Sequence, residues 1–174
     1  MASTTSSWVD SLFLQLKERV AGTSLFPVFD GILKHRLPND IHLAVFVEPY
    51  LTFVLNGKKT VESRFSVNRH APYEQVRPGD LLLLKKSSGP ICGLCRVSHV
   101  WYYRLDPSSW VEIEHQAAAL CMDESPFWKK KRAASFATLM RLEDVMVIPD
   151  TSIDKLDPRG WVVLRSSNRQ GRLI

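Results

Sequence analysis

The sequence predicts one α+β domain in which a small or partly open β-barrel carries helices on its outside. With 174 residues and 45% hydrophobic content, the chain has the length of one domain and enough apolar side chains for a core. After residue 40, short segments rich in β-branched and aromatic residues outnumber the helical segments. Turn signals such as Pro78-Gly79 and Gly89-Pro90 separate them. Short, closely spaced strands favour a barrel over a doubly wound parallel sheet.

The N-terminal part of the chain predicts two helices. Residues 7–20 place apolar side chains at helical spacing, and Ser7 is a suitable N-cap. Gly22 is a suitable stop for this helix. The apolar but irregular stretch 25–37 predicts a second short helix that ends before Pro38.

The middle of the chain predicts four strands and one short helix. The strands are expected, from their β-branched and aromatic content and the turns between them, at residues 42–48, 61–67, 81–86 and 91–103. Residues 50–56 predict the helix between the first two strands. Gly57 follows at the position where helices commonly end in a left-handed conformation.

The C-terminal third predicts a helix, a basic turn and two more strands. Asp106 begins a helix with one apolar face, formed by Trp110, Ile113, Ala117 and Leu120. The elements expected after it are a basic helical turn at 126–131, a long bulged strand at 135–147, a loop at 150–158 and a closing strand at 160–164.

Composition limits the classes of protein that fit. No stretch approaches the roughly 18 apolar residues that a membrane span needs, and the N-terminus lacks the pattern of a secretory signal. We therefore expect no membrane partner and a cytoplasmic location. The net charge of +5 permits binding to polyanions without requiring it.

The cysteines do not predict a metal or redox site. Cys92, Cys95 and Cys121 are too few for a disulfide framework, and with the five histidines they do not form the spacing of a zinc site. Strand alternation places Cys92 and Cys95 on opposite faces, which favours packed thiols over a redox pair. No Gly-rich phosphate loop occurs, so neither a metal nor a cofactor is expected.

The main functional signal lies at Gly57, Lys59, Glu62 and Arg64. Gly57 ends the short helix, and Lys59 follows in the turn. A strand that begins at residue 61 places Glu62 and Arg64 on one face, within reach of Lys59. The three ionisable groups then form a compact cluster. Charge and spacing alone also fit a solvated strand face with an ion pair worth about 0–1 kcal/mol.

This pattern, G-x-K-x-x-E-x-R after Glu48-Pro49-Tyr50, resembles the signature of the ASCH domain, a branch of the PUA-like superfamily. Residues 76–82, 136–145 and 159–164 resemble later strands of the same family. The resemblance implies a PUA-like β-barrel with flanking helices and a cleft lined by the lysine, glutamate and arginine of the motif.

The resemblance also divides the chain. It covers residues 41–165, which are expected to form the ASCH domain. Residues 1–40 then form an N-terminal helical extension. Residues 166–174 form a basic C-terminal tail, expected to fray.

Because family members are linked to nucleic acid, the resemblance implies a module that binds RNA, another nucleic acid or a nucleoside-like small molecule. Lys59 and Arg64 would contact phosphate or a base edge, and Glu62 would accept from an amino group. Tyr50 or Phe65 would supply a stacking surface, although each also fits a core position.

The alternative is a small hydrolase. Some ASCH-like proteins are similar to amidohydrolases that deacetylate acetylcytidine, and ribonuclease activity is also associated with the family. Lys59 and Glu62 would then be catalytic, with Glu62 as general base on water. Those amidohydrolases have a threonine nucleophile where this chain has Glu62, which puts the same mechanism in doubt. Other residues considered for such chemistry are Thr60, Glu112, Glu114, His70 and His99.

The strongest basic run, at Lys129, Lys130, Lys131 and Arg132, is a candidate nucleic-acid contact. A longer phosphate track would add Lys85, Lys86, Arg165, Arg169 and Arg172. A solvated basic turn without a partner is the alternative interpretation.

Overall fold

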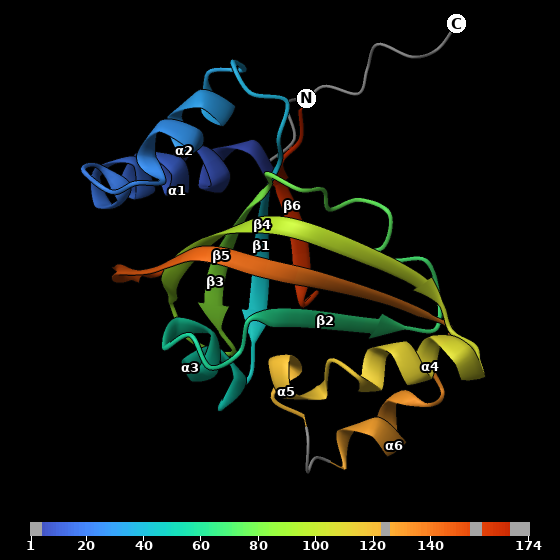
Figure 1. The fold of residues 1–174 in the computed structure, drawn as a ribbon. Coiled ribbons are helices and arrows are strands. Elements are labelled where there is room, and N and C mark those ends of the chain that lie inside the picture. Colours follow the sequence, from blue (N-terminus) through green and yellow to red (C-terminus); the bar gives the residue numbers. More distant parts are fainter. Residues whose placement is uncertain (1–4, 123–125, 154–157, 168–174) are drawn as a thin grey trace, which may run out of the picture.

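A six-stranded mixed sheet, with helices packed at two ends, forms the molecule (Figure 1). The computed structural model describes residues 5–122, 126–153 and 158–167. The elements in chain order are α1 (Thr5–Val20), α2 (Phe26–Leu33), β1 (Ile41–Phe46), α3 (Tyr50–Leu55), β2 (Val61–Ser66), β3 (Leu81–Lys86), β4 (Ile91–Arg104), α4 (Pro107–Glu114), α5 (Ala117–Leu120), α6 (Phe127–Lys131), β5 (Phe136–Thr151) and β6 (Trp161–Arg165).

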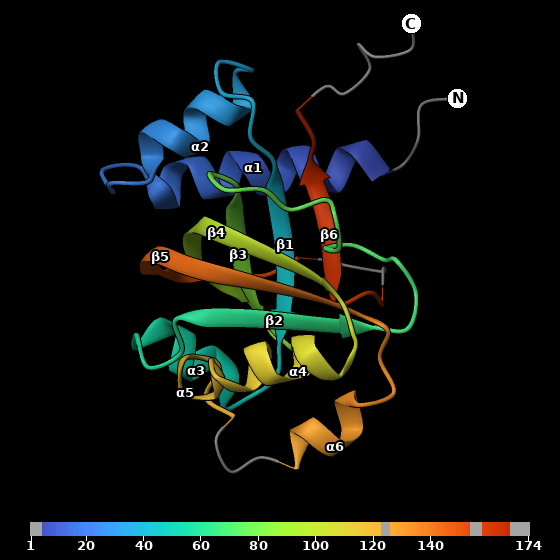
Figure 2. The same ribbon diagram turned by 45° about the vertical axis from the view of Figure 1, so that its right-hand side comes forward.

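The strand order is β2-β5-β4-β3-β1-β6, so β2 and β6 are the two edges. β1 and β3 run parallel with Ile41 opposite Leu81, and the other neighbouring strands are antiparallel. The sheet curls into a half-barrel, which brings β2 near the start of β6 (Figure 2). The predicted α+β fold, a barrel-like sheet with flanking helices, is therefore confirmed in an open form.

Three apolar clusters hold the helices to the sheet. The first joins α1 and α2 to the sheet, with Leu16, Phe29, Leu43 and Leu83 fully buried. The second lies on the other side of the central strands and includes residues of α3, and the third lies under α4 and α5. Because α1 and α2 contribute to the first cluster, they share a core with the sheet. Each fully buried large aliphatic side chain stabilises the fold by about 1.5–3 kcal/mol.

Register shifts explain several differences from the expected boundaries. Against β4, β5 has three shifts, and Asp144 adopts a φ of 53°, which confirms a bulged strand. This strand continues to Thr151, so it occupies the start of the expected loop; residues 154–157 lie outside the described residues. A shift beside Cys92 also breaks the simple alternation of β4. Cys92 and Cys95, predicted on opposite faces, therefore both pack against the second cluster.

Two predicted helices are shorter than expected. α2 ends at Leu33 rather than beside Pro38. The helix expected from Asp106 is divided into α4 and α5, and Asp106 caps α4 by accepting from the Ser109 amide at 2.8 Å. Of the helices that the structure describes, none combines the length and the apolar character needed to cross a membrane. Residues 168–174 of the expected tail lie outside the described part of the chain.

Candidate functional site

The turn after α3 places Lys59 beside β2. Gly57 adopts a φ of +80°, a left-handed conformation that suits glycine, and the Lys59 amide then donates to the Phe53 carbonyl at 2.8 Å. Within β2, alternation places Glu62 and Arg64 on one face. The motif thus positions its three charged side chains through one helix end and one strand.

These three side chains form an ionic cluster, which we call the KER cluster (Lys59, Glu62 and Arg64); Lys59 and Glu62 are buried, and Arg64 is partly exposed. The Lys59 ammonium lies 3.4 Å from Glu62 Oε2 and donates to the Leu120 carbonyl at 2.8 Å. Arg64 Nε lies 2.9 Å from Glu62 Oε1 as an ion pair rather than an aligned hydrogen bond. Lys59 is only 2% exposed and Glu62 5% exposed, so the alternative of a solvated surface pair is wrong.

Arg64 also reaches across the open side of the half-barrel. Its Nη2 donates to the Val45 carbonyl at 2.9 Å, beside the end of β1, and its Nη1 lies 3.4 Å from the Gly160 carbonyl, just before β6. The guanidinium lies 5.0 Å from the Phe46 ring centroid and 5.4 Å from that of Trp161. Arg64, on the edge strand β2, therefore connects to two strands with which β2 shares no backbone pairing.

A pocket of about 300 Å³ lies against the KER cluster. Tyr50, which the sequence proposes as a ligand-binding residue, lines this pocket, and so do Ser63, Phe65 and Lys131. Ser63 is 7% exposed, and its Oγ has no hydrogen-bond partner in the described structure. Sequence reasoning missed Ser63, since strand alternation placed it away from Glu62; only its burial without a partner singles it out.

The basic run at 129–132 divides by position. Lys131 lines the pocket, whereas Lys129 and Lys130 are exposed on α6. Arg132 forms an ion pair with Glu114, and its guanidinium lies 4.6 Å from the Trp110 ring centroid. Arg132 thus has a structural role in holding α6 against α4, while Lys131 is the lysine of this run that lines the pocket.

The longer phosphate track is not assembled in the described structure. Lys85 is largely buried, and Arg165 donates to the Leu33 carbonyl at the end of α2, on the far side of the sheet from α6 (Figure 1). Lys86 is exposed. Arg169 and Arg172 lie outside the described residues.

Other residues considered for hydrolysis do not line the pocket. Thr60 is exposed just before β2, and Glu114 is paired with Arg132. Glu112 lies beside Tyr103, where burial and this carboxylate raise the pKa of the tyrosine. His99 packs 4.3 Å from Trp101 on β4, and His70 lines a separate, larger pocket.

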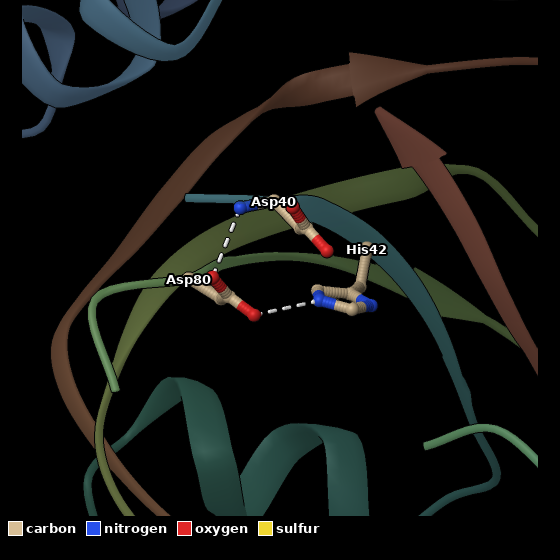
Figure 3. Close-up of side chains that lie close together, drawn as sticks. All are labelled: Asp40, His42 and Asp80. Atoms are coloured by element: carbon tan, nitrogen blue, oxygen red, sulfur yellow. Dashed lines mark hydrogen bonds and ion pairs between the residues drawn. The ribbon is translucent and has the colours of Figure 1, made fainter. Parts of the chain in front are cut away.

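A second cluster, Asp40, His42 and Asp80, is buried where β1 and β3 begin (Figure 3). Trp161 Nε1 donates to His42 Nδ1 at 3.1 Å, and the other ring nitrogen lies 3.0 Å from Asp80. Because an indole can only donate, the imidazole is neutral with its proton on Nε2, directed at Asp80.

The buried polar atoms of this second cluster form hydrogen bonds within the protein. Asp80 also accepts from the backbone amides of Asp40 and Arg77, at 2.9 and 2.8 Å. Both nitrogens of His42 and both carboxylate oxygens of Asp80 therefore have protein partners. The arrangement suits a structural link between β1, β3 and β6 better than a set of metal ligands.

Comparison with known proteins gives the same fold. The family model of the ASCH domain matches residues 45–146. The crystal structure of ASCH from Zymomonas mobilis has a TM-score of 0.59 at 12% identity, covering 72% of this chain and 88% of that chain. Structures of two mutants of the Zymomonas mobilis protein have TM-scores of 0.55 at 11% and 12% identity, covering 74% and 75% of this chain and 93% and 92% of theirs. No curated protein matches the sequence.

The curled mixed sheet, its flanking helices and the charged pocket define a small PUA-like half-barrel protein. Identities near 12% establish only the fold. The family match is decisive because it spans more than half of the sequence, and the chain belongs to the ASCH domain family. The resemblance predicted from the sequence is therefore confirmed.

Proposed function

We propose that the protein binds RNA, or a nucleotide-like ligand, with one base held in the pocket beside the KER cluster. The observation that carries this proposal is a buried Lys59–Glu62 pair lining a pocket. A buried ion pair often contributes less stability than apolar residues of similar size. Stability alone is therefore a weak reason for this pair, and recognition of a polar ligand is a better one.

The side chains suggest complementary roles. The Glu62 carboxylate would accept from an exocyclic amino group of a base, and the Ser63 hydroxyl supplies hydrogen-bonding capacity that no described residue uses. Lys131 would bring positive charge to a phosphate. Contacts with described residues involve three of the five N–H groups of Arg64, so its larger role would be to orient Glu62.

The aromatic side chains differ in how well they suit base stacking. Phe65 is stacked on Trp110 with the ring centroids 5.5 Å apart and the planes 3° apart, so one face of Phe65 is covered. Tyr50 packs edge-on against Phe53, and the Lys59 ammonium lies 5.6 Å from its ring centroid. We expect Tyr50 to form a wall of the base pocket.

Fluorescence anisotropy with labelled single-stranded RNAs, measured over a range of salt concentrations, tests the proposal. Replacing Lys129 and Lys130 together by glutamine should weaken binding to all sequences. The salt slope should fall by about 0.7 for each phosphate that the variant no longer neutralises. Glu62→Gln should instead change the preference among bases, because a pocket reads a base whereas exposed lysines read the backbone.

Glu18→Gln is a matched control, since it makes the same chemical change on the exposed side of α1. Unchanged affinity, salt slope and selectivity in both test variants would contradict the proposal. Mass spectrometry of acetylcytidine and RNA incubated with the protein decides the catalytic alternative. Turnover that Glu62→Gln abolishes would favour the hydrolase, with Lys59 and Glu62 as its catalytic residues.

A further inference from the structure

A larger pocket, of about 720 Å³, lies on the open side of the half-barrel. One wall comes from β2 and the segment after it, and the other comes from Arg159 and β6. Figure 2 shows these two edges of the sheet approaching each other. Arg64 and Phe65 line this pocket as well as the smaller one, so the two cavities are neighbours that share a wall.

The larger pocket is lined by cationic side chains. Arg64, Arg69 and Arg159 contribute guanidinium groups, and His70 contributes an imidazole. No aspartate or glutamate is among the described residues that line it. Arg64 forms an ion pair with Glu62 of the KER cluster. The Arg69 guanidinium lies 3.8 Å from the Glu74 carboxylate, and both of these side chains are well exposed. Guanidinium groups that converge on one cavity suit an anion, and phosphate in particular.

The wall that carries Arg69 and His70 is packed in place. Tyr73 is 6% exposed, and its ring centroid lies 4.9 Å from that of Phe136 and 5.4 Å from that of Tyr102. The Arg69 guanidinium lies 5.5 Å from the Phe136 centroid. These contacts hold the segment after β2 against β4 and β5, so the cations belong to an ordered wall.

We propose that this larger pocket binds a phosphate group of the ligand whose base lies beside the KER cluster. The inference rests on the proposed function and makes it more specific. Arg64 separates the two cavities, so base and phosphate would occupy opposite sides of its side chain. The protein would then distinguish a phosphorylated nucleotide from a nucleoside, whether the phosphate belongs to a free nucleotide or to an RNA backbone.

Isothermal titration calorimetry with the four ribonucleosides, their 5′-monophosphates and a short single-stranded RNA tests this inference. We expect the best monophosphate to bind at least about tenfold more tightly than its nucleoside, as one charged hydrogen bond would give. Arg159→Gln should remove most of that ratio while nucleoside affinity stays the same. Glu62→Gln should weaken nucleoside and monophosphate together. Arg141→Gln, an exposed arginine that lines neither pocket, is the matched control.

The possible results separate the two proposals. If a nucleoside binds through Glu62 but Arg159→Gln changes neither the monophosphate ratio nor the affinity for RNA, the phosphate inference is wrong and the proposed function stands. RNA binding that loses affinity in Arg159→Gln without a matching effect on monophosphates would assign the pocket to backbone phosphate. If no nucleoside, nucleotide or RNA binds, the proposed function fails. Phosphorus NMR with pyrophosphate then tests the pocket alone. If pyrophosphate shows no binding that depends on Arg159, the inference is wrong too.

Discussion

Replacing Glu62 by glutamine should destabilise the protein strongly, because it leaves the Lys59 ammonium buried without a carboxylate. Lys59 is 2% exposed and, among the described residues, would keep the Leu120 carbonyl as its close polar partner. Removing one member of a buried ion pair costs about 3–5 kcal/mol. Since that carbonyl remains, we expect the lower end, about 3 kcal/mol, for Glu62→Gln.

Removing the other member of the ion pair, Lys59, should cost less stability. In Lys59→Met, Glu62 keeps Arg64 at 2.9 Å, and the main loss is the hydrogen bond to the Leu120 carbonyl. That loss is worth about 1–2 kcal/mol. The double variant should cost little more than Lys59→Met alone, because no ammonium remains to be left unpaired. The coupling between the two positions is then about 2–3 kcal/mol.

Urea unfolding at neutral pH, followed by circular dichroism and by tryptophan fluorescence, measures the four free energies of the cycle. Glu18→Gln should stay within about 0.5 kcal/mol of the parent, as exposed substitutions generally do. A loss below about 1 kcal/mol for Glu62→Gln would refute the reasoning. Additive costs in the double variant would refute it equally, since they would mean that the two charges do not interact.

Three further predictions concern other parts of the molecule. The hydrogen bond from Lys34, supported by Lys17, lowers the pKa of Asp30, so its contribution to stability is present at neutral pH and lost as the pH falls through the acid range. Asp30→Asn should therefore flatten the acid side of a plot of unfolding free energy against pH, and an unchanged slope would contradict this. Burial raises the pKa of the Cys95 thiol, so alkylation followed by peptide mapping should modify Cys121 in the native protein and Cys95 only after unfolding; equal rates for both would contradict it. A fragment of residues 41–165 should aggregate or unfold, because without α1 and α2 it exposes Leu43 and Leu83. Size-exclusion chromatography that shows a folded monomer of this fragment would contradict the prediction.

The sequence predicted the order and type of the elements well, because local signals define most of them. Residues 81–86 form a strand as expected, since an apolar run between two turns leaves few alternatives. The boundary of β5 and the placement of Cys92 and Cys95 on one side were missed. Both depend on register shifts that involve β4, which follow from pairing across the sheet and leave no local signal.

The candidate site likewise has features that the sequence predicted and others that it did not. Glu62 and Arg64 share a face through strand periodicity, and Lys59 joins them through a neighbouring turn, so local spacing suffices. The reach of Arg64 to Val45 and Gly160 depends on how the sheet curls, which spacing does not reveal. Whether these residues bind a ligand stays a prediction for the experiments above.

The contact between Asp40 and Asp80 depends on how β1 pairs with β3. Each aspartate directly precedes a strand, and the parallel pairing of Ile41 with Leu81 brings the two side by side. Two Asp-strand boundaries in the sequence were a usable signal. Only the knowledge that these two strands are parallel neighbours would have turned that signal into a contact.

The position of β1 between β3 and β6 has a consequence for folding during synthesis. One pairing partner of β1, the strand Leu81–Lys86, is made about 40 residues after β1. The other partner, Trp161–Arg165, lies near the end of the described residues. Pairings so distant in sequence are slow to form, because long loops must close first. Until Trp161–Arg165 has been made, β1 has only one side paired, and His42 lacks the indole of Trp161. The unpaired edge of β1, the strand that joins β3 to β6, is therefore open to pairing with other chains until β6 has been made.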